Sequence, residues 1–364
     1  GVDVVAVGGR RLLDSQREGF VNGIYCQASG RALRRLIRSN DRPDTVYHVH
    51  SWAQILSPSI FAALKPVAER VFITAHDFFL VCPNGNFMIY PESRQCELRP
   101  MSGSCIATNC DKRNYLQKTW RVARQAALNS ILDIDKFPFT VIAIQKGAVD
   151  YLVRGGIPEE RIRVLSNPAV RLLPERAPAE KNAEALYVGR LEHEKGVELL
   201  AAAALASGTP LRVIGEGPAE GAIRKANPEA MFTGWLSTGE LAGALKSARF
   251  LVMPSRCTEP FGLAGAEALS VGVPVIASKS CLIGGDIRRL EIGDVVDVFN
   301  ADLFAAMLKR WMSDDALIEK MSRAAIRKAS AIGASPDEWL DAHLRLYDGL
   351  FQSAPVTTAR FARA

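Results

Sequence analysis

Two glutamates, Glu259 and Glu267, stand in a stretch whose pattern predicts a strand, a loop, a helix and a second strand. The strands are the apolar runs 250–253 and 273–277. This order is typical of a crossover unit in a parallel sheet, with the loop at the carboxyl edge where ligands bind. Glu267 is surrounded by small apolar residues, where a carboxylate costs free energy unless something pairs with it. Both carboxylates are therefore candidates for catalysis or binding.

The start of the expected helix offers a second kind of contact. Phe261, Gly262 and Leu263 bring backbone N–H groups that have no partner inside the helix, and Gly262 lets a ligand approach closely. An anion at this helix tip, flanked by carboxylates that can accept hydroxyl groups, indicates a nucleotide sugar. A glycosidase pair fits less well. Eight helical residues separate the Cα atoms of Glu259 and Glu267 by about 12 Å, whereas hydrolases hold paired carboxyl groups at about 5–9.5 Å.

Two further loops are expected at the same sheet edge. The loop that begins Gly189-Arg190 and ends Lys195-Gly196 carries two permanent cations, Arg190 and Lys195, which can converge on a diphosphate. The loop at Glu216 and Gly217 resembles a dinucleotide fingerprint only weakly, because Pro218 replaces an N–H donor. We interpret it as a turn that closes on the base or the phosphates of a ligand.

The 364 residues contain two successive alternations of strands and helices, which predict an α/β fold with parallel, doubly wound sheets. Two similar halves joined by a linker imply a cleft between them, where a ligand should lie. The expected segments are an acceptor-side domain at 1–170 with a Cys-rich insertion at 82–114, a linker at 171–183, a nucleotide-sugar-binding domain at 184–333, a helix at 336–351 that packs back towards the N-terminal domain, and a frayed tail at 352–364.

These residues together resemble the retaining glycosyltransferases of family 4. The resemblance rests on Gly189-Arg190 with Lys195, on Gly215-Glu216-Gly217-Pro218, and on the Glu-x7-Glu element from Glu259 to Glu267 with Phe-Gly-Leu inside it. It covers the second half almost completely and most of the first, including the strand-end His76. It implies the GT-B fold, in which two Rossmann-like domains face a cleft.

The resemblance also implies roles for these residues. Arg190 and Lys195 would hold the donor diphosphate and stabilise the leaving group in place of a metal ion, so that catalysis requires no cofactor. Glu267 would bind the ribose, Glu259 the donor sugar, and His76 the sugar from across the cleft. The other expected nucleotide-binding residues are Gly189, Glu216, Gly217, Phe261, Gly262 and Leu263. The alternative for His76 is a satisfied strand-end histidine, which is also how we interpret His48 and His50.

The beginning of the chain departs from the family pattern. The run Asp3–Val7 reads as a short buried strand and resembles the second strand of the family's N-terminal domain. The resemblance then implies that the first strand, its glycine-rich loop and the first helix precede residue 1, so that the isolated chain would be truncated and inactive.

The insertion carries Cys82, Cys96, Cys105 and Cys110 in a stretch rich in Pro, Gly, Asn and Ser. A loop of this length with few apolar residues needs another source of order. One structural zinc ion bound by the four thiolates would supply it, although the spacings lack Cys-x-x-Cys pairs. Free or disulfide-paired thiols are the alternative. The odd count of seven cysteines favours a reducing compartment.

The composition, 48% apolar and 23% charged, is that of a globular chain, with no apolar run long enough to cross a bilayer. The net charge of +6 indicates an acidic partner, and we expect no nucleic acid. Arg31, Arg34, Arg35 and Arg38 fall on one face of an expected helix at 29–39. This face either meets an anionic membrane or a phosphorylated acceptor, or is an ordinary solvated surface.

The sequence therefore predicts a glycosyltransferase that moves a sugar from a nucleotide-diphosphate donor to a saccharide or lipid-linked saccharide acceptor. By resemblance, we expect it to act in polysaccharide biosynthesis, in the cytoplasm or as a peripheral protein at the inner face of the membrane. The alternatives are a nucleotide-sugar epimerase of similar fold and a catalytically inactive donor-binding subunit.

Overall fold

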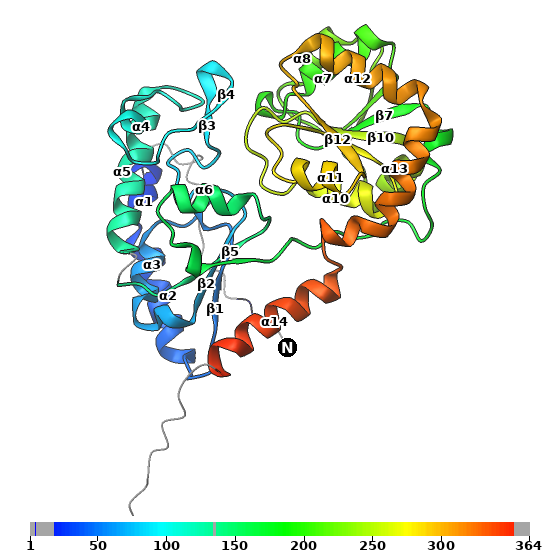
Figure 1. The fold of residues 1–364 in the computed structure, drawn as a ribbon. Helices are drawn as coiled ribbons and strands as arrows, with labels where there is room; N and C mark the ends of the chain where they lie inside the picture. Colours follow the sequence, from blue (N-terminus) through cyan, green and yellow to red (C-terminus); the bar gives the residue numbers. More distant parts are fainter. Residues whose placement is uncertain (1–3, 5–17, 134–135, 353–364) are drawn as a thin grey trace, which may run out of the picture.

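The computed structural model describes residue 4 and residues 18–133 and 136–352, and it contains two parallel sheets (Figure 1). The first sheet has the strand order β1-β2-β5-β6, and the second has the order β12-β11-β10-β7-β8-β9. Apart from Val4, the predicted strand Asp3–Val7 lies outside the described residues, as does the predicted tail beyond Gln352.

The first half contains the smaller sheet, with a long insertion between β2 and α5. Its strands are β1 (Tyr47–Val49), β2 (Val71–Ala75), β5 (Thr140–Ala143) and β6 (Ile162–Val164), and its helices are α1 (Glu18–Ile24), α2 (Gln27–Asn40), α3 (Ser59–Leu64), α5 (Tyr115–Ile131) and α6 (Ala148–Arg154). The insertion adds β3 (Met88–Ile89), β4 (Arg94–Gln95) and α4 (Gly103–Ala107).

The second half contains the larger sheet. Its strands are β7 (Glu184–Val188), β8 (Leu211–Ile214), β9 (Met231–Gly234), β10 (Ala248–Met253), β11 (Val275–Ser278) and β12 (Gly293–Val296). Its helices are α7 (Val197–Ser207), α8 (Glu220–Ala226), α9 (Thr238–Lys246), α10 (Leu263–Ser270), α11 (Gly284–Arg289), α12 (Ala301–Ser313) and α13 (Asp315–Lys328), and α14 (Pro336–Gln352) follows.

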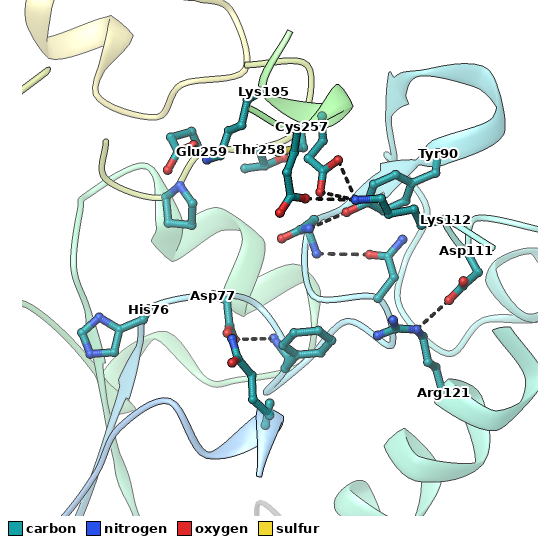
Figure 2. Close-up of a pocket in the computed structure, with 18 of the residues that line it drawn as sticks. His76, Asp77, Tyr90, Asp111, Lys112, Arg121, Lys195, Cys257, Thr258 and Glu259 are labelled. Atoms are coloured by element: carbon teal, nitrogen blue, oxygen red, sulfur yellow. Dashed lines mark hydrogen bonds and ion pairs between the residues drawn. The ribbon is translucent and has the colours of Figure 1, made fainter. Parts of the chain in front are cut away.

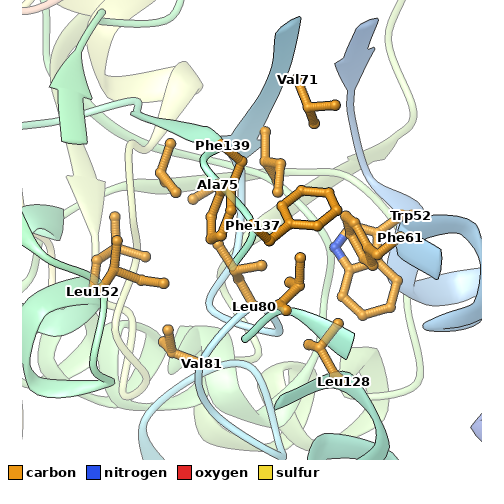
Figure 3. Close-up of a cluster of buried hydrophobic side chains, with 14 of the residues drawn as sticks. Trp52, Phe61, Val71, Ala75, Leu80, Val81, Leu128, Phe137, Phe139 and Leu152 are labelled. Atoms are coloured by element: carbon orange, nitrogen blue, oxygen red, sulfur yellow. The ribbon is translucent and has the colours of Figure 1, made fainter. Parts of the chain in front are cut away.

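The central strands are mostly apolar because both faces of a parallel sheet are covered by helices. Every residue of β2 and of β10 is buried. In the first half, the rings of Trp52 and Phe61 pack edge to face with their centroids 5.0 Å apart. They belong to the hydrophobic cluster drawn in Figure 3, which also contains Phe137 and Phe139. This rigid packing fixes the strand ends, from which the candidate site is built.

From the sequence alone, Ser51 is expected to open a single helix that reaches about Lys65, and this prediction is wrong. The chain instead forms a 3₁₀ turn at Trp52–Gln54, then α3, then a second 3₁₀ segment at Lys65–Arg70. Pro58 stands immediately before α3. Proline has no N–H to donate and disfavours helical geometry in the residue before it, so the helix can start only after this position.

The insertion is ordered by its own packing. Phe87, Met88 and Ile89 are buried, and β3 pairs with β4 as a short antiparallel hairpin. The side-chain amide of Asn84 donates to the carbonyl oxygens of Met88 at 2.7 Å and Cys110 at 3.1 Å. These contacts hold the two ends of the loop together without a covalent link.

Helix α14 returns to the first half and lies beside β1 (Figure 1). The His48 side chain, on β1, bonds to the Tyr347 hydroxyl at 2.5 Å and to the Thr74 hydroxyl at 2.7 Å. Its ring also stacks on that of His343 with centroids 5.6 Å apart. Within the described part of the chain, no helix is long and apolar enough to span a bilayer.

Three histidines at the ends of β1 and β2 have pKa values below the ordinary value of 6.5. Burial, followed by the charges of His50, His343 and His76, lowers the pKa of His48 to about 3. Burial also lowers the pKa of His50 and of His76. The unfolded chain takes up these protons near pH 6.5, so the stability from the neutral rings is complete above that pH and is lost as pH falls towards 3.

We therefore expect the melting temperature to fall between pH 7 and pH 4, and His48→Gln to make that fall shallower. Glutamine can keep a hydrogen bond to Thr74 or Tyr347 but does not titrate. Thermal denaturation of both proteins over this pH range measures the effect. Parallel curves for wild type and variant would show that His48 does not contribute to the acid sensitivity.

Candidate active site

A cavity of about 610 Å³ lies at the carboxyl edge of the six-stranded sheet. It is formed by the loops that follow β7, β8, β9 and β10 and by the first turns of α10. This is the edge at which ligands bind in open α/β sheets. Its lining includes Tyr187, Gly189, Arg190, Lys195, Gly215, Trp235, Thr238, Ser255, Glu259, Gly262, Leu263 and Glu267.

An ion pair between Lys195 and Glu259 joins the loop after β7 to the loop after β10. The Ser255 hydroxyl donates to the same Glu259 carboxylate at 3.2 Å. Burial alone would lower the pKa of Lys195, but the charge and hydrogen bond of Glu259 raise it. The pair therefore keeps a charged ammonium in a largely desolvated place.

Arg190 lines the same cavity as this pair, and its side chain is more exposed than that of Lys195. Its guanidinium reaches Glu192 at 2.6 Å, and its side chain is 67% exposed. The loop that carries Arg190 runs against the loop after β8, where a Cβ at Gly215 would lie 2.0 Å from the Gly189 carbonyl oxygen. Only glycine, at a φ of +131°, allows this approach. The backbone of Gly189 and Gly215 is thereby brought to the cavity wall.

The tip of α10 is shaped by Gly262. Its φ of +77° is left-handed, and a Cβ there would lie 2.0 Å from the Met253 side chain. The helix therefore begins directly against β10. One turn later Glu267 projects into the cavity, and no side chain among the described residues pairs with its carboxylate. Burial raises the pKa of this group.

A second cavity of about 560 Å³ is lined by both halves of the chain (Figure 2). Lys112 of the insertion closes one side, with its ammonium 3.0 Å from carboxylate oxygens of both Glu192 and Glu194. Arg190, Lys195 and Glu259 line this cavity as well as the first one. These three side chains therefore stand at the boundary between the two spaces.

His76 follows β2 and lines the second cavity, on the side opposite Lys195 and Glu259 (Figure 2). Its Nε2 lies 2.9 Å from Nδ1 of His50. Only one of these facing nitrogens can donate, so at least one of the two rings must be neutral at this position. From the sequence, His50 was interpreted as a structural residue. Its contact with His76 depends on the parallel pairing of β1 with β2, and this pairing cannot be read from the sequence.

The structure separates the predicted binding residues into two groups. Gly189, Arg190, Lys195, Glu259, Gly262, Leu263 and Glu267 all line the first cavity. Glu216 is exposed, and neither it nor Gly217 lines a cavity described here. The Phe261 side chain is buried in the core, so only its backbone faces the helix tip.

Sequence reasoning did not select Trp235, which follows β9 and lines the first cavity. Its side chain is 78% exposed, so a face of the indole is open to a planar ligand. The sequence did contain a signal for it: Trp235 closely follows an apolar run expected to be a strand, as do the loops that begin at Gly189 and Gly215.

The structure does not support the predicted zinc site of Cys82, Cys96, Cys105 and Cys110. Among the described residues, no group of three or more His, Cys, Asp or Glu side chains is placed to hold a metal. The cation in this cluster is the buried ammonium of Lys118, 3.2 Å from Cys110 Sγ and 3.6 Å from Cys105 Sγ. Burial lowers the pKa of Lys118, but interactions with Cys110 and Cys105 raise it, so that the net shift is upward.

Comparison with known proteins identifies the second half. Residues 172–328 match the family model described as Glycosyl transferases group 1. The chain is 38% identical over 145 residues to a GDP-mannose-dependent alpha-mannosyltransferase of Corynebacterium glutamicum, covering 38% of this chain and 33% of the relative. It is 32% identical over 167 residues to a glycogen synthase of Mycobacterium tuberculosis, covering 43% of this chain and 40% of the relative. The matches thus span less than half the length of these relatives.

Solved structures extend the similarity to both halves. A sucrose-phosphate synthase of Thermosynechococcus elongatus superimposes with a TM-score of 0.66 and 20% identity, over 90% of this chain and 78% of that one. The Anabaena protein HepE, crystallised with UDP, has a TM-score of 0.61 and 16% identity, over 89% and 82%. The predicted α/β class and GT-B fold are confirmed.

The unpaired carboxylate of Glu267 leads to a prediction about the ligand-free protein. Its pKa is raised in the folded state, so its ionisation at neutral pH costs stability. Glu267→Gln should raise the melting temperature by about 2–4 °C at pH 7, for roughly 1 kcal/mol gained. The gain should shrink as pH falls towards 4.5.

Differential scanning calorimetry without nucleotide measures this change. The exposed Glu229 serves as the matched control, and Glu229→Gln should leave the melting temperature unchanged. A loss of stability in Glu267→Gln would mean that the carboxylate has a stabilising partner in the free protein.

Proposed function

We propose that this chain is a retaining glycosyltransferase that moves a sugar from a nucleotide-diphosphate donor to a saccharide or lipid-linked saccharide acceptor. The observation that carries the proposal is the boundary between the two cavities. Lys195, Glu259 and Arg190 line both spaces, so two cations and one carboxylate would stand where a donor in one cavity meets an acceptor in the other. The setting we propose is polysaccharide assembly in the cytoplasm, at the inner face of a membrane.

The first cavity accounts for each part of the donor. The exposed face of Trp235 would stack on the base, and the free Glu267 carboxylate would accept bonds from the ribose hydroxyls. The diphosphate would lie between Arg190, Lys195 and the N–H groups at the tip of α10. Glu259 would then reach hydroxyls of the sugar. Named relatives support a nucleoside diphosphate sugar but differ in the base, GDP in one and UDP in another.

The chemistry needs charge stabilisation on the leaving group. The acceptor oxygen bonds to the anomeric carbon, the bond from that carbon to the phosphate oxygen breaks, and the departing phosphate takes the acceptor proton. Arg190 and Lys195 would stabilise the negative charge that develops on the diphosphate. His76 would contact the sugar from the opposite wall, held in place by His50.

The second cavity would receive the acceptor. Its wall in the first half comes from strand ends and from the insertion, through Asn84, Asn86, Tyr90 and Lys112. These amide, hydroxyl and ammonium groups lie close together and can form hydrogen bonds with the hydroxyl groups of a saccharide. In this proposal residues 1–170 form the acceptor-side domain and residues 184–333 the donor-side domain, joined by the linker at 171–183.

Trp235→Ala should weaken nucleoside diphosphate binding about 5- to 150-fold, because stacking of a base on an aromatic ring contributes roughly 1–3 kcal/mol. Isothermal titration calorimetry with UDP, GDP and ADP measures the affinity. Trp235→Phe keeps a ring and should recover most of it. Equal affinity in wild type and Trp235→Ala would place the base elsewhere.

Incubation with a panel of UDP-, GDP- and ADP-sugars and a saccharide acceptor tests the reaction itself. We expect release of the nucleoside diphosphate and a glycoside whose anomeric configuration, read by NMR, equals that of the donor. Lys195→Ala should lower turnover about 10²- to 10³-fold, whereas Lys309→Ala, at an exposed lysine of α12, should not.

The other outcomes identify the alternatives. An altered donor sugar without release of the nucleoside diphosphate would indicate an epimerase. Donor binding without turnover would indicate an inactive donor-binding subunit. An inverted product would keep the transferase but overturn retention.

A further inference from the structure

Helix α2 carries a basic surface that the proposed reaction does not use. We define it by Arg31, Arg34, Arg35 and Arg38, which together with Tyr25 and Gln27 surround a shallow hollow of about 460 Å³. All four guanidinium groups belong to exposed residues. The sequence had placed these arginines on one helix face, and the structure shows that the face is open.

These arginines have no carboxylate partner in the described part of the chain. Arg34 donates to the Gly30 carbonyl oxygen at 3.3 Å, within its own helix. Nearby Arg70, in contrast, forms a two-pronged pair with Asp41. Like charges three and four residues apart destabilise a helix. The basic surface is therefore unfavourable in the free protein and calls for an anionic partner.

The other face of α2 holds the arginines in position. Ile37 and Gly30 are buried, and a Cβ at Gly30 would lie 3.1 Å from the Ser59 carbonyl oxygen of α3. The helix thus packs closely on α3, and its basic face can point only outward. A partner would meet a preformed array of charges.

Exposed apolar side chains lie on α1, which directly precedes α2 in the chain, and on α5, which α1 contacts. Phe20 and Val21 on α1 are 50% and 68% exposed, and Tyr25 links them to the hollow. The Trp120 indole donates to the Phe20 carbonyl oxygen at 2.7 Å and so fixes α1 on α5, where Leu116 is 71% exposed. Figure 1 shows α1, α2 and α5 on the same side of the first half.

We propose that this side of the molecule binds the surface of a bilayer that contains anionic lipids. The four arginines contact the lipid phosphates, and Phe20, Val21 and Leu116 enter the boundary between headgroups and acyl chains. An exposed apolar rim beside unpaired cations fits a bilayer better than a soluble phosphorylated ligand, which would leave the rim in water. The proposal rests on the proposed function for its purpose, which is to bring the second cavity to a lipid-linked acceptor.

Sedimentation with vesicles tests the surface without any donor or acceptor. The probes are vesicles of 30% phosphatidylglycerol in phosphatidylcholine and vesicles of phosphatidylcholine alone, at low and high salt. We expect binding to the anionic vesicles that weakens with salt. Replacing all four arginines with glutamine should weaken it at least about 100-fold, at roughly fivefold for each basic residue.

A matched control separates this surface from net charge. Changing Lys225, Lys246, Lys309 and Arg327 to glutamine removes the same charge from exposed positions of the second half and should leave binding within a few-fold of wild type. Val21→Asp should weaken binding severalfold even at low salt. Circular dichroism and melting temperature confirm that each variant is folded.

Three outcomes would overturn the proposal: no preference of the wild type for anionic vesicles, equal losses in the two fourfold variants, or binding of inositol hexakisphosphate at this surface without binding of vesicles. The last outcome would indicate a soluble phosphorylated partner. None of them bears on the transfer reaction, which is measured with soluble substrates.

Discussion

The ion pair between Lys195 and Glu259 is the contact on which the candidate site depends. It crosses from the loop after β7 to the loop after β10, so it fixes two elements that are 64 residues apart in the chain. Each partner makes the charge of the other tolerable in a place that water hardly reaches. Both side chains also line the two cavities. In the proposed function, a diphosphate would replace Glu259 as the partner of Lys195, and a sugar hydroxyl would replace Lys195 as the partner of Glu259. In the ligand-free protein the ion pair therefore lets both side chains stay charged at the site.

Most of the fold could be predicted because buried parallel strands are continuous apolar runs. The predicted run 250–253 lies in β10, and the predicted run 273–277 overlaps β11 (Val275–Ser278). The prediction of one helix from Ser51 was wrong because Pro58 interrupts it. The spacing of apolar residues alone does not show that a proline ends a helix. Contacts between segments far apart were beyond reach: the meeting of His50 with His76, or of Tyr347 with His48, follows from strand order and from the return of α14.

The cysteine cluster shows a different limit. Four thiols in a polar loop suggested a cation, and the cluster does contain one, but it is the ammonium of Lys118. Lys118 belongs to α5, outside the loop. Its charge is fully buried, and the sulfur atoms are its hydrogen-bond partners among the described residues. The zinc prediction was therefore wrong, because the composition of the loop does not reveal that a lysine of a neighbouring helix packs among its thiols.

Two features of this chain are unfavourable in isolation: the unpaired Glu267 carboxylate in the first cavity and the like-charged arginines on α2. Other charged side chains do have ionic partners; Arg70 pairs with Asp41, and Arg121 pairs with the buried Asp111. Local conflicts of this kind are expected where a protein binds something, because the ligand supplies the missing partner. The two features demand opposite chemistry, hydroxyl donors for Glu267 and anions for the arginines. In the proposed function the ribose of a nucleotide would supply the hydroxyl groups, and at the proposed membrane surface lipid headgroups would supply the anions.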